Sequence, residues 1–209
     1  MGSIRLAVDT GGTFTDITVL EEDTGTVSIA KVPSRRDDPS GALIEAVGKG
    51  HEIANVDATD VSLLVHGTTI ITNAVLENKL PGTSLITTEG FRDVLEIGRH
   101  FRPDMYDLQQ VKVPPLVPRE RRYCVAERMT SKGEVLVTPE HDEVLRLAEV
   151  IRKTNSNTVA VCFLNAFINP ANEILVRDWL IAELPDASIS ASHEVCREIR
   201  EFERMSTVA

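Results

Sequence analysis

The sequence has few cysteines, few aromatic residues and no long apolar run. Its three cysteines, Cys124, Cys162 and Cys196, are far apart and form no CxxC pair, which argues against a disulfide framework and a structural zinc site. No run approaches the roughly 20 apolar residues that a membrane-spanning helix needs. We therefore expect no membrane association. Because no apolar leader segment with a cleavage site opens the chain, we expect a cytoplasmic location.

Basic residues are also scarce. The chain has 22 Lys and Arg residues against 32 Asp and Glu residues, and its formal net charge is -10. Nucleic acids and anionic membranes are bound mainly through Lys and Arg, so this balance argues against both as partners. A nucleotide remains compatible with it, because backbone N–H groups can hold phosphates locally.

Two familiar nucleotide-binding motifs are missing as well. The chain contains neither a GxxxxGK[ST] P-loop nor a GxGxxG dinucleotide fingerprint. It has instead a glycine pair, Gly11-Gly12, between two apolar, Thr-rich runs that predict strands. Phosphate binding, if present, therefore has to come from a turn between strands.

The order of the predicted elements indicates an α/β fold. Seven elements follow one another: strands over residues 4–9, 14–20 and 26–32, a helix from Asp38-Pro39, a strand over 61–66, a helix over 69–78 and a strand over 83–87. The strand over 61–66 is apolar nearly throughout, so we expect it to be buried on both faces. The order β-β-β-α-β-α-β is typical of the ribonuclease-H-like core of actin, Hsp70 and the sugar kinases.

The remaining residues predict further α/β elements. We expect a ribonuclease-H-like core over about residues 1–100 and an additional α/β part over about 101–194. Strand and helix patterns alternate in this second part, and no internal repeat is visible.

The most informative segment is residues 9–16, with the sequence DTGGTFTD. A turn that presses its backbone against phosphates needs glycine, which Gly11 and Gly12 supply. Thr13 and Thr15 add hydroxyl donors, and Asp9 and Asp16 are candidates to hold Mg²⁺ through its water shell. A glycine-rich hairpin with purely local hydrogen bonds is the alternative, and the position between the first two strands favours phosphate binding.

A second candidate segment is residues 66–74, HGTTIITNA, where a strand gives way to a helix. The carboxyl ends of such strands are common ligand positions in α/β sheets. Gly67 permits close approach, and Thr68 and Thr69 lie at the start of the helix, where free N–H groups favour an anion. His66 is a candidate proton donor or acceptor. The alternative, a core histidine with threonines that only cap the helix, stays open.

These two segments resemble the hydantoinase/oxoprolinase family, which includes N-methylhydantoinase A subunits, 5-oxoprolinases and acetone and acetophenone carboxylase subunits. Further similarity runs along essentially the whole chain, in TTEGFRDVLEIGR over 87–99, VAER over 125–128 and AVCFLNAF over 160–167. Several spaced motifs in one order make the resemblance more specific than either glycine turn alone. One departure is Cys196-Arg197, where the family often has an apolar residue and proline.

The resemblance implies an actin-like ATPase that uses ATP and Mg²⁺ to activate a carbonyl oxygen. It implies catalytic roles for Asp9 and His66, nucleotide contacts from Gly11, Gly12, Thr13, Thr15, Asp16, Gly67, Thr68, Thr69 and Asn73, and metal binding by Asp9 and Asp16. In the hydantoinase branch the substrate is a cyclic amide, and in the carboxylase branch it is a ketone. A non-catalytic nucleotide-binding or assembly module is a third possibility.

Family members are much longer than 209 residues and carry a second phosphate turn. We therefore expect these residues to be an N-terminal lobe, inactive alone, and truncated before the second ATPase lobe. A B-type partner subunit and an oligomeric assembly are also implied by the resemblance.

Overall fold

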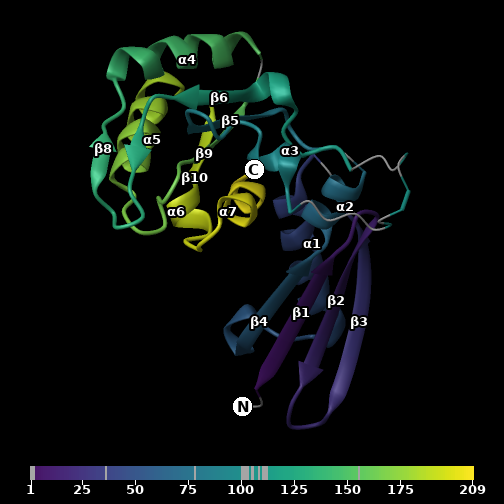
Figure 1. Ribbon diagram of the computed structural model, residues 1–209. Helices are drawn as coiled ribbons and strands as arrows, with labels where there is room; N and C mark the ends of the chain where they lie inside the picture. The colour runs from purple at the N-terminus through teal and green to yellow at the C-terminus, as the bar shows by residue number, and fades with distance from the viewer. Residues whose placement is uncertain are drawn as a thin grey trace. The chain divides into compact units, whose positions relative to one another are not determined.

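The computed structural model describes residues 3–35, 37–77, 79–99, 104, 106–107, 109, 113–154 and 156–209. The chain divides into two compact units, residues 1–80 and 81–209 (Figure 1). Within the described residues, no helix combines the length and the apolar content that crossing a membrane requires. The seven predicted elements occur in the predicted order, with a short 3-10 helix added before the fourth strand.

The first unit is a four-stranded sheet with one long helix. Its elements are β1 (Ile4–Thr10), β2 (Phe14–Glu21), β3 (Thr26–Pro33), α1 (Pro39–Ala54), the 3-10 helix Ala58–Asp60, β4 (Val61–Thr68) and α2 (Ile70–Leu76). The sheet has the order β3-β2-β1-β4. The first three strands are antiparallel neighbours, as the hairpin connections predict, and β4 runs parallel to β1.

One face of this sheet forms a core with α1. Along β1 the side chains alternate, so Ile4, Leu6 and Val8 are buried while the residues between them are exposed. Together with residues of β2, β3 and α1 they form one apolar cluster. Asp38 starts α1 as predicted, because its carboxylate accepts a hydrogen bond from the Gly41 N–H at 2.9 Å.

The contact between α1 and β2 depends on Gly50. A Cβ at this buried position would lie 2.6 Å from Ile17 Cδ1 and 3.2 Å from Val19 Cγ2. We expect Gly50→Val to lower the free energy of unfolding by about 1–3 kcal/mol, the usual effect of overpacking a core. Urea denaturation followed by circular dichroism measures this. Gly48→Val is the matched control, since a Cβ at Gly48 meets nothing within 4 Å on the same helix. Equal losses at the two positions would contradict the packing argument.

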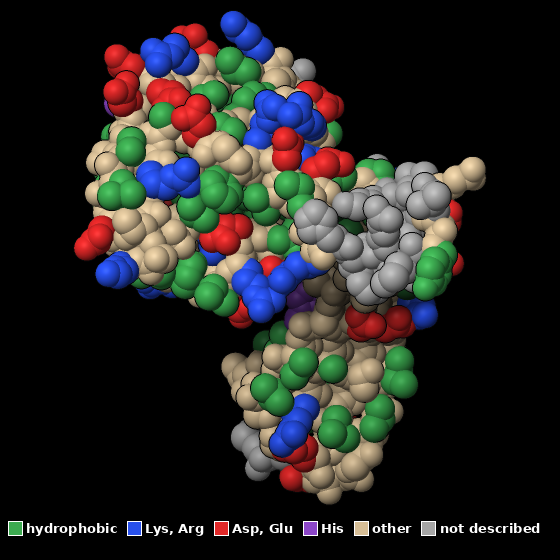
Figure 2. Space-filling model, in the orientation of Figure 1, with side chains coloured by type: hydrophobic (Ala, Val, Ile, Leu, Met, Phe, Trp, Pro, Cys, Tyr) green, Lys and Arg blue, Asp and Glu red, His purple; other side chains and the backbone are tan. Residues whose placement is uncertain are grey.

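The expectation that β4 is buried on both faces is wrong. Leu63, Leu64 and Val65 are 45%, 48% and 53% exposed. The reason is its place in the sheet: β4 is an edge strand with β1 as its neighbour, and α1 packs on β1, β2 and β3. Hydrophobic side chains are accordingly visible on the surface of this unit in Figure 2.

The second unit is built on a parallel sheet. Its elements are β5 (Thr83–Thr88), α3 (Val94–Ile97), the 3-10 helix Arg119–Arg121, β6 (Arg122–Val125), β7 (Arg128–Met129), β8 (Val135–Val137), α4 (His141–Lys153), β9 (Thr158–Cys162), α5 (Ala171–Glu183), β10 (Ser188–Ala191), α6 (Ser192–Val195) and α7 (Glu201–Val208). The sheet order is β10-β9-β5-β6, with parallel neighbours throughout, and β7 and β8 form a separate hairpin. The last strand of the predicted core, β5, therefore pairs in this second sheet.

Helices cover both faces of the second sheet. On one face, α4 and α5 contribute Val144, Ile151 and Leu180 to a buried cluster, and on the other α7 contributes Met205. Cys124, Cys162 and Cys196 are free thiols. Burial raises the pKa of the Cys162 thiol to about 12, so it is an inert core residue.

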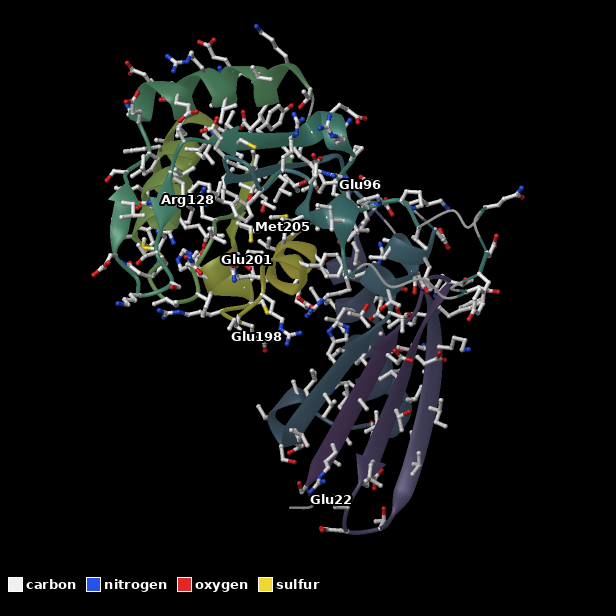
Figure 3. The ribbon with its side chains drawn as sticks, in the orientation of Figure 1. Glu22, Glu96, Arg128, Glu198, Glu201 and Met205 are labelled. Atoms are coloured by element: carbon white, nitrogen blue, oxygen red, sulfur yellow. The ribbon has the colours of Figure 1, made fainter. Side chains whose placement is uncertain are left out.

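A buried polar network joins the ends of β9 and β10 to α5 and α7. The Glu173 carboxylate, fully buried, accepts hydrogen bonds from Phe163 N–H, Ser192 Oγ and His193 N–H at 2.7–2.9 Å. Arg204, also fully buried, donates to the Phe163 carbonyl at 2.7 Å and to Ser192 Oγ at 3.1 Å. In Figure 3, its neighbours Glu201 and Met205 mark α7. The two charges thus share Ser192 as a common partner.

Candidate phosphate and metal site

The glycine turn joins β1 to β2 and leaves little room for a side chain at Gly11. Gly11 N–H donates to the Phe14 carbonyl at 3.0 Å, and a Cβ on Gly11 would lie 3.0 Å from that same oxygen. A Cβ on Gly12 would lie 3.4 Å from Asn73 Nδ2. A side chain at Gly11 would crowd the turn, and without side chains at either glycine the turn presents its backbone to a ligand.

The two threonines that follow the glycines have different environments. Thr13 is exposed, and its carbonyl accepts a hydrogen bond from Ser34 N–H at 3.0 Å. Thr15 is fully buried, and its Oγ1 lies 3.0 Å from Ser34 Oγ. The Thr15 hydroxyl therefore ties the turn to the end of β3, and of the two threonines only Thr13 presents an exposed hydroxyl.

Asp9 and Asp16 lie directly opposite each other on neighbouring strands. Both side chains project from the face of the sheet opposite α1, because the flanking residues of β1 are the buried ones. Like charges opposite each other in a sheet are destabilising unless a cation lies nearby. Lys31 supplies one, with its Nζ 3.1 Å from Asp16 Oδ1.

This pair suits Mg²⁺. Magnesium in nucleotide sites is held by one or two carboxylates together with phosphate oxygens and waters. In the described part of the chain, no group of three or more His, Cys, Asp or Glu side chains could hold a metal ion. Asp9 and Asp16 thus offer carboxylate oxygens for such an ion, with the remaining ligands left to phosphate and water.

Residues 66–73 run from the carboxyl end of β4 into α2, as predicted, and lie beside the carboxyl end of β1. Thr69 N–H and Thr68 Oγ1 both donate to the Thr10 carbonyl at 3.2 Å. Asn73 Nδ2 donates to Thr69 Oγ1 at 3.4 Å. The side chains of Thr68 and Thr69 thus bond within the protein, while Asn73 borders the glycine turn.

His66 and Asp9 project from opposite faces of the sheet. The parallel register pairs His66 with Val8 and Gly67 with Asp9, so Gly67 shares the face of Asp9. His66 Nε2 lies 3.0 Å from Thr10 Oγ1, on the face that α1 covers. The two side chains expected to be catalytic are therefore not brought together around one point. Thr10 was not among the predicted site residues. It connects the two positions, because it follows Asp9 in β1 and its hydroxyl contacts His66.

A cavity of about 270 Å³ opens beside the turn. It is lined by Gly11, Gly12, Ser34, Arg35, Ile70, Asn73, Ala74, Glu77 and Lys79. Gly11, Gly12 and Asn73 are among the site residues predicted from the sequence, whereas Ser34, Arg35 and Lys79 are not. The β2–β3 hairpin could have indicated Ser34 and Arg35. Because Pro33 pairs with Phe14, the residues that follow β3 return to the glycine turn.

Comparison with known proteins decides the family. Residues 5–184 match the hydantoinase/oxoprolinase N-terminal region. The chain belongs to this family. The caprolactamase subunit alpha of Pseudomonas jessenii is 31% identical over 210 residues, which cover 97% of this chain and 30% of that subunit. The acetophenone carboxylase gamma subunit of Aromatoleum aromaticum is 31% identical over 219 residues, 96% of this chain and 29% of that subunit.

A solved structure supports the same assignment. The crystal structure of the ATP-dependent caprolactamase from Pseudomonas jessenii superimposes with a TM-score of 0.80 at 30% identity, covering 98% of this chain and 30% of that one. The predicted fold class is thereby confirmed. This member of the hydantoinase/oxoprolinase family spans about a third of the length of the relatives that it matches.

Proposed function

We propose that this chain is the N-terminal lobe of an ATP-dependent cyclic-amide hydrolase of the hydantoinase/5-oxoprolinase type. The observation that carries the proposal is the glycine turn, which lies beside a pair of facing carboxylates and lines a cavity. Similarity to a caprolactamase subunit favours a cyclic amide as the substrate class.

Each part of the site has a role in this proposal. The backbone N–H groups of Gly11 and Gly12, with Thr13, contact phosphate oxygens. Asp9 and Asp16 hold Mg²⁺, which neutralises charge on the phosphates. Asn73, on α2, borders the same turn and helps to position the phosphates.

His66 is proposed to exchange a proton with the substrate or to bond its carbonyl. Its ring lies on the α1 face, beside Thr10. The role therefore requires the substrate to approach from that face, while the metal lies on the other. Gly67, Thr68 and Thr69 shape the backbone between these two positions.

The chemistry explains why such an enzyme needs ATP. A resonance-stabilised amide is a poor electrophile. Transfer of the terminal phosphoryl group of ATP to the ring carbonyl oxygen removes that stabilisation and releases ADP. Water then attacks the carbonyl carbon, the ring C–N bond breaks with protonation of the nitrogen, and inorganic phosphate leaves to give the ring-opened product. A second lobe, a B-type partner subunit and an oligomeric, cytoplasmic enzyme complete the proposal.

A substrate panel tests the reaction class. In the complete enzyme we expect hydantoin, 5-oxoproline or caprolactam to stimulate ATP hydrolysis, because each offers a ring amide oxygen to be phosphorylated. Phosphate release is the measurement, and the ring-opened products are the control, since they offer no ring amide. The second candidate is a carboxylase subunit, which the acetophenone carboxylase relative supports. If only acetone or acetophenone, each given with bicarbonate, stimulates ATP hydrolysis, the proposal is overturned in favour of this candidate.

A further inference from the structure

Two cationic side chains line the cavity beside the glycine turn and have no role in the proposed function. Arg35 and Lys79 both line it, together with Gly11, Gly12 and Asn73. They come from separate segments: Arg35 follows β3, and Lys79 follows α2. Acidic residues outnumber basic ones in residues 1–80, so two cations at one cavity stand out against the charge of this unit.

We propose that Arg35 and Lys79 bind the anionic oxygens of a polyphosphate chain in this cavity. The inference rests on the proposed function and extends it, because it names the residues that supply positive charge to the phosphates. The glycine turn offers neutral N–H groups, which position phosphate but carry no net charge. Asp9 and Asp16 add negative charge close by. A polyphosphate therefore needs cationic side chains in the cavity in addition to the metal ion that the carboxylates would hold.

The backbone holds both residues at fixed positions relative to the turn. Ser34, directly before Arg35, donates its N–H to the Thr13 carbonyl at 3.0 Å, and its Oγ lies 3.0 Å from Thr15 Oγ1. Lys79 N–H donates to the Ala74 carbonyl at 2.9 Å, which ties it to the end of α2. The side chains are long enough to move while their anchors stay in place.

Each cation is held by a carboxylate that phosphate can replace. Arg35 Nη2 contacts Glu45 Oε2 at 2.5 Å, and Lys79 Nζ contacts Glu77 Oε2 at 2.7 Å. All four side chains are 42–62% exposed. Exposed ion pairs of this kind contribute roughly 0–1 kcal/mol, so exchanging the carboxylate costs little. Phosphate carries more charge and accepts two parallel hydrogen bonds from a guanidinium group.

The size and lining of the cavity fit phosphate groups better than a whole nucleotide. Its volume of about 270 Å³ lies just below the range of about 300–1,000 Å³ found for drug-sized ligands. Ile70 and Ala74 give it apolar walls.

An NMR titration of the ¹⁵N-labelled 209-residue chain tests this inference. Mg·ATP and sodium tripolyphosphate are added separately, up to millimolar concentration, and the amide shifts of Gly11 and Gly12 report binding. We expect Arg35→Gln and Lys79→Gln each to raise the Kd of both probes about tenfold, or about 1.4 kcal/mol. Both should also flatten the dependence of log Kd on log salt, because each removes one charge contact.

Lys49→Gln is the matched control. Lys49 also belongs to the first unit, is 51% exposed and pairs with a carboxylate, Glu52, at 2.8 Å, but it does not line the cavity. We expect the Kd of this variant for both probes to stay within twofold of the wild-type value. An equal loss of affinity in this variant would overturn the inference, because a general effect of net charge would then explain the result.

The outcomes separate this inference from the proposed function. If Arg35→Gln and Lys79→Gln leave the affinity and its salt dependence unchanged, the inference is overturned. If the wild type still binds in that case and Gly12→Val abolishes the binding, the glycine turn remains the phosphate site. Failure of the wild type to bind either probe at millimolar concentration overturns the inference, whereas ATP hydrolysis by the complete enzyme is the separate test of the proposed function. Binding of tripolyphosphate without Mg·ATP, lost in the two variants, supports the cationic subsite and counts against ATP as its ligand.

Discussion

Asp9→Asn is expected to lower ATP turnover of the complete enzyme by about 10²- to 10³-fold, since a metal ion and its charge contribute several kcal/mol to phosphoryl transfer. Asparagine keeps the size of the side chain but removes one of the two carboxylates that face each other across β1 and β2. Lys31 would then neutralise the remaining Asp16 charge. Affinity for the cation should fall together with turnover.

Two measurements make this test specific. Phosphate release gives turnover, and electron paramagnetic resonance of Mn²⁺, a substitute for Mg²⁺, gives metal affinity without reference to activity. Asp23→Asn is the control, because Asp23 is an exposed acidic residue in the β2–β3 turn of the same unit. Turnover and Mn²⁺ affinity that survive in Asp9→Asn, with an unchanged circular dichroism spectrum, would remove Asp9 from the metal site.

Arg204→Ala is expected to destabilise the second unit by about 3–5 kcal/mol, the usual result of removing one charge from a buried, hydrogen-bonded charged network. The guanidinium group is fully buried and satisfies the Phe163 carbonyl, the Glu198 carbonyl and Ser192 Oγ. Without it, the Phe163 and Glu198 carbonyls each lose a donor, and Ser192 Oγ, which donates to the buried Glu173 carboxylate, loses its contact with the guanidinium group. The Tm should fall by on the order of 10 °C.

Urea denaturation and calorimetry measure this loss. Arg146→Ala is the matched control, because Arg146 is an exposed residue of α4, where such a change should stay within about 0.5 kcal/mol. Arg204→Lys should recover part of the stability, since it restores the charge but not the forked geometry. A loss below about 1 kcal/mol in Arg204→Ala would show that the network is not a main source of stability.

Local chemistry made the glycine turn and most secondary structure predictable from the sequence. Gly11 and Gly12 between two strand patterns mark a tight turn, and Asp38-Pro39 marks a helix start, because both signals depend on a few neighbouring residues. The order of the first seven elements followed from hydrophobic periodicity in the same way. The motif resemblance also identified the family, since residues 5–184 match it.

The sequence could not predict which strands pair or which face a side chain occupies. An apolar strand pattern is the same for a central strand and for an edge strand, so β4 was expected to be buried, although it lies at the edge of its sheet. For β5, strand pairing with β9 and β6, distant in the chain, determined its sheet. Such pairing depends on contacts between residues far apart in the sequence, which local patterns do not encode.

The sequence alone therefore identified two candidate ligand segments, residues 9–16 and 66–73, because of their glycines and their positions next to strands. Only the tertiary structure decided how they are used. The parallel register of β1 and β4 separates Asp9 from His66 by the sheet itself, because neighbouring residues of a strand point to opposite faces. The β2–β3 hairpin and the end of α2 bring Arg35 and Lys79 to the cavity that Gly11 and Gly12 line.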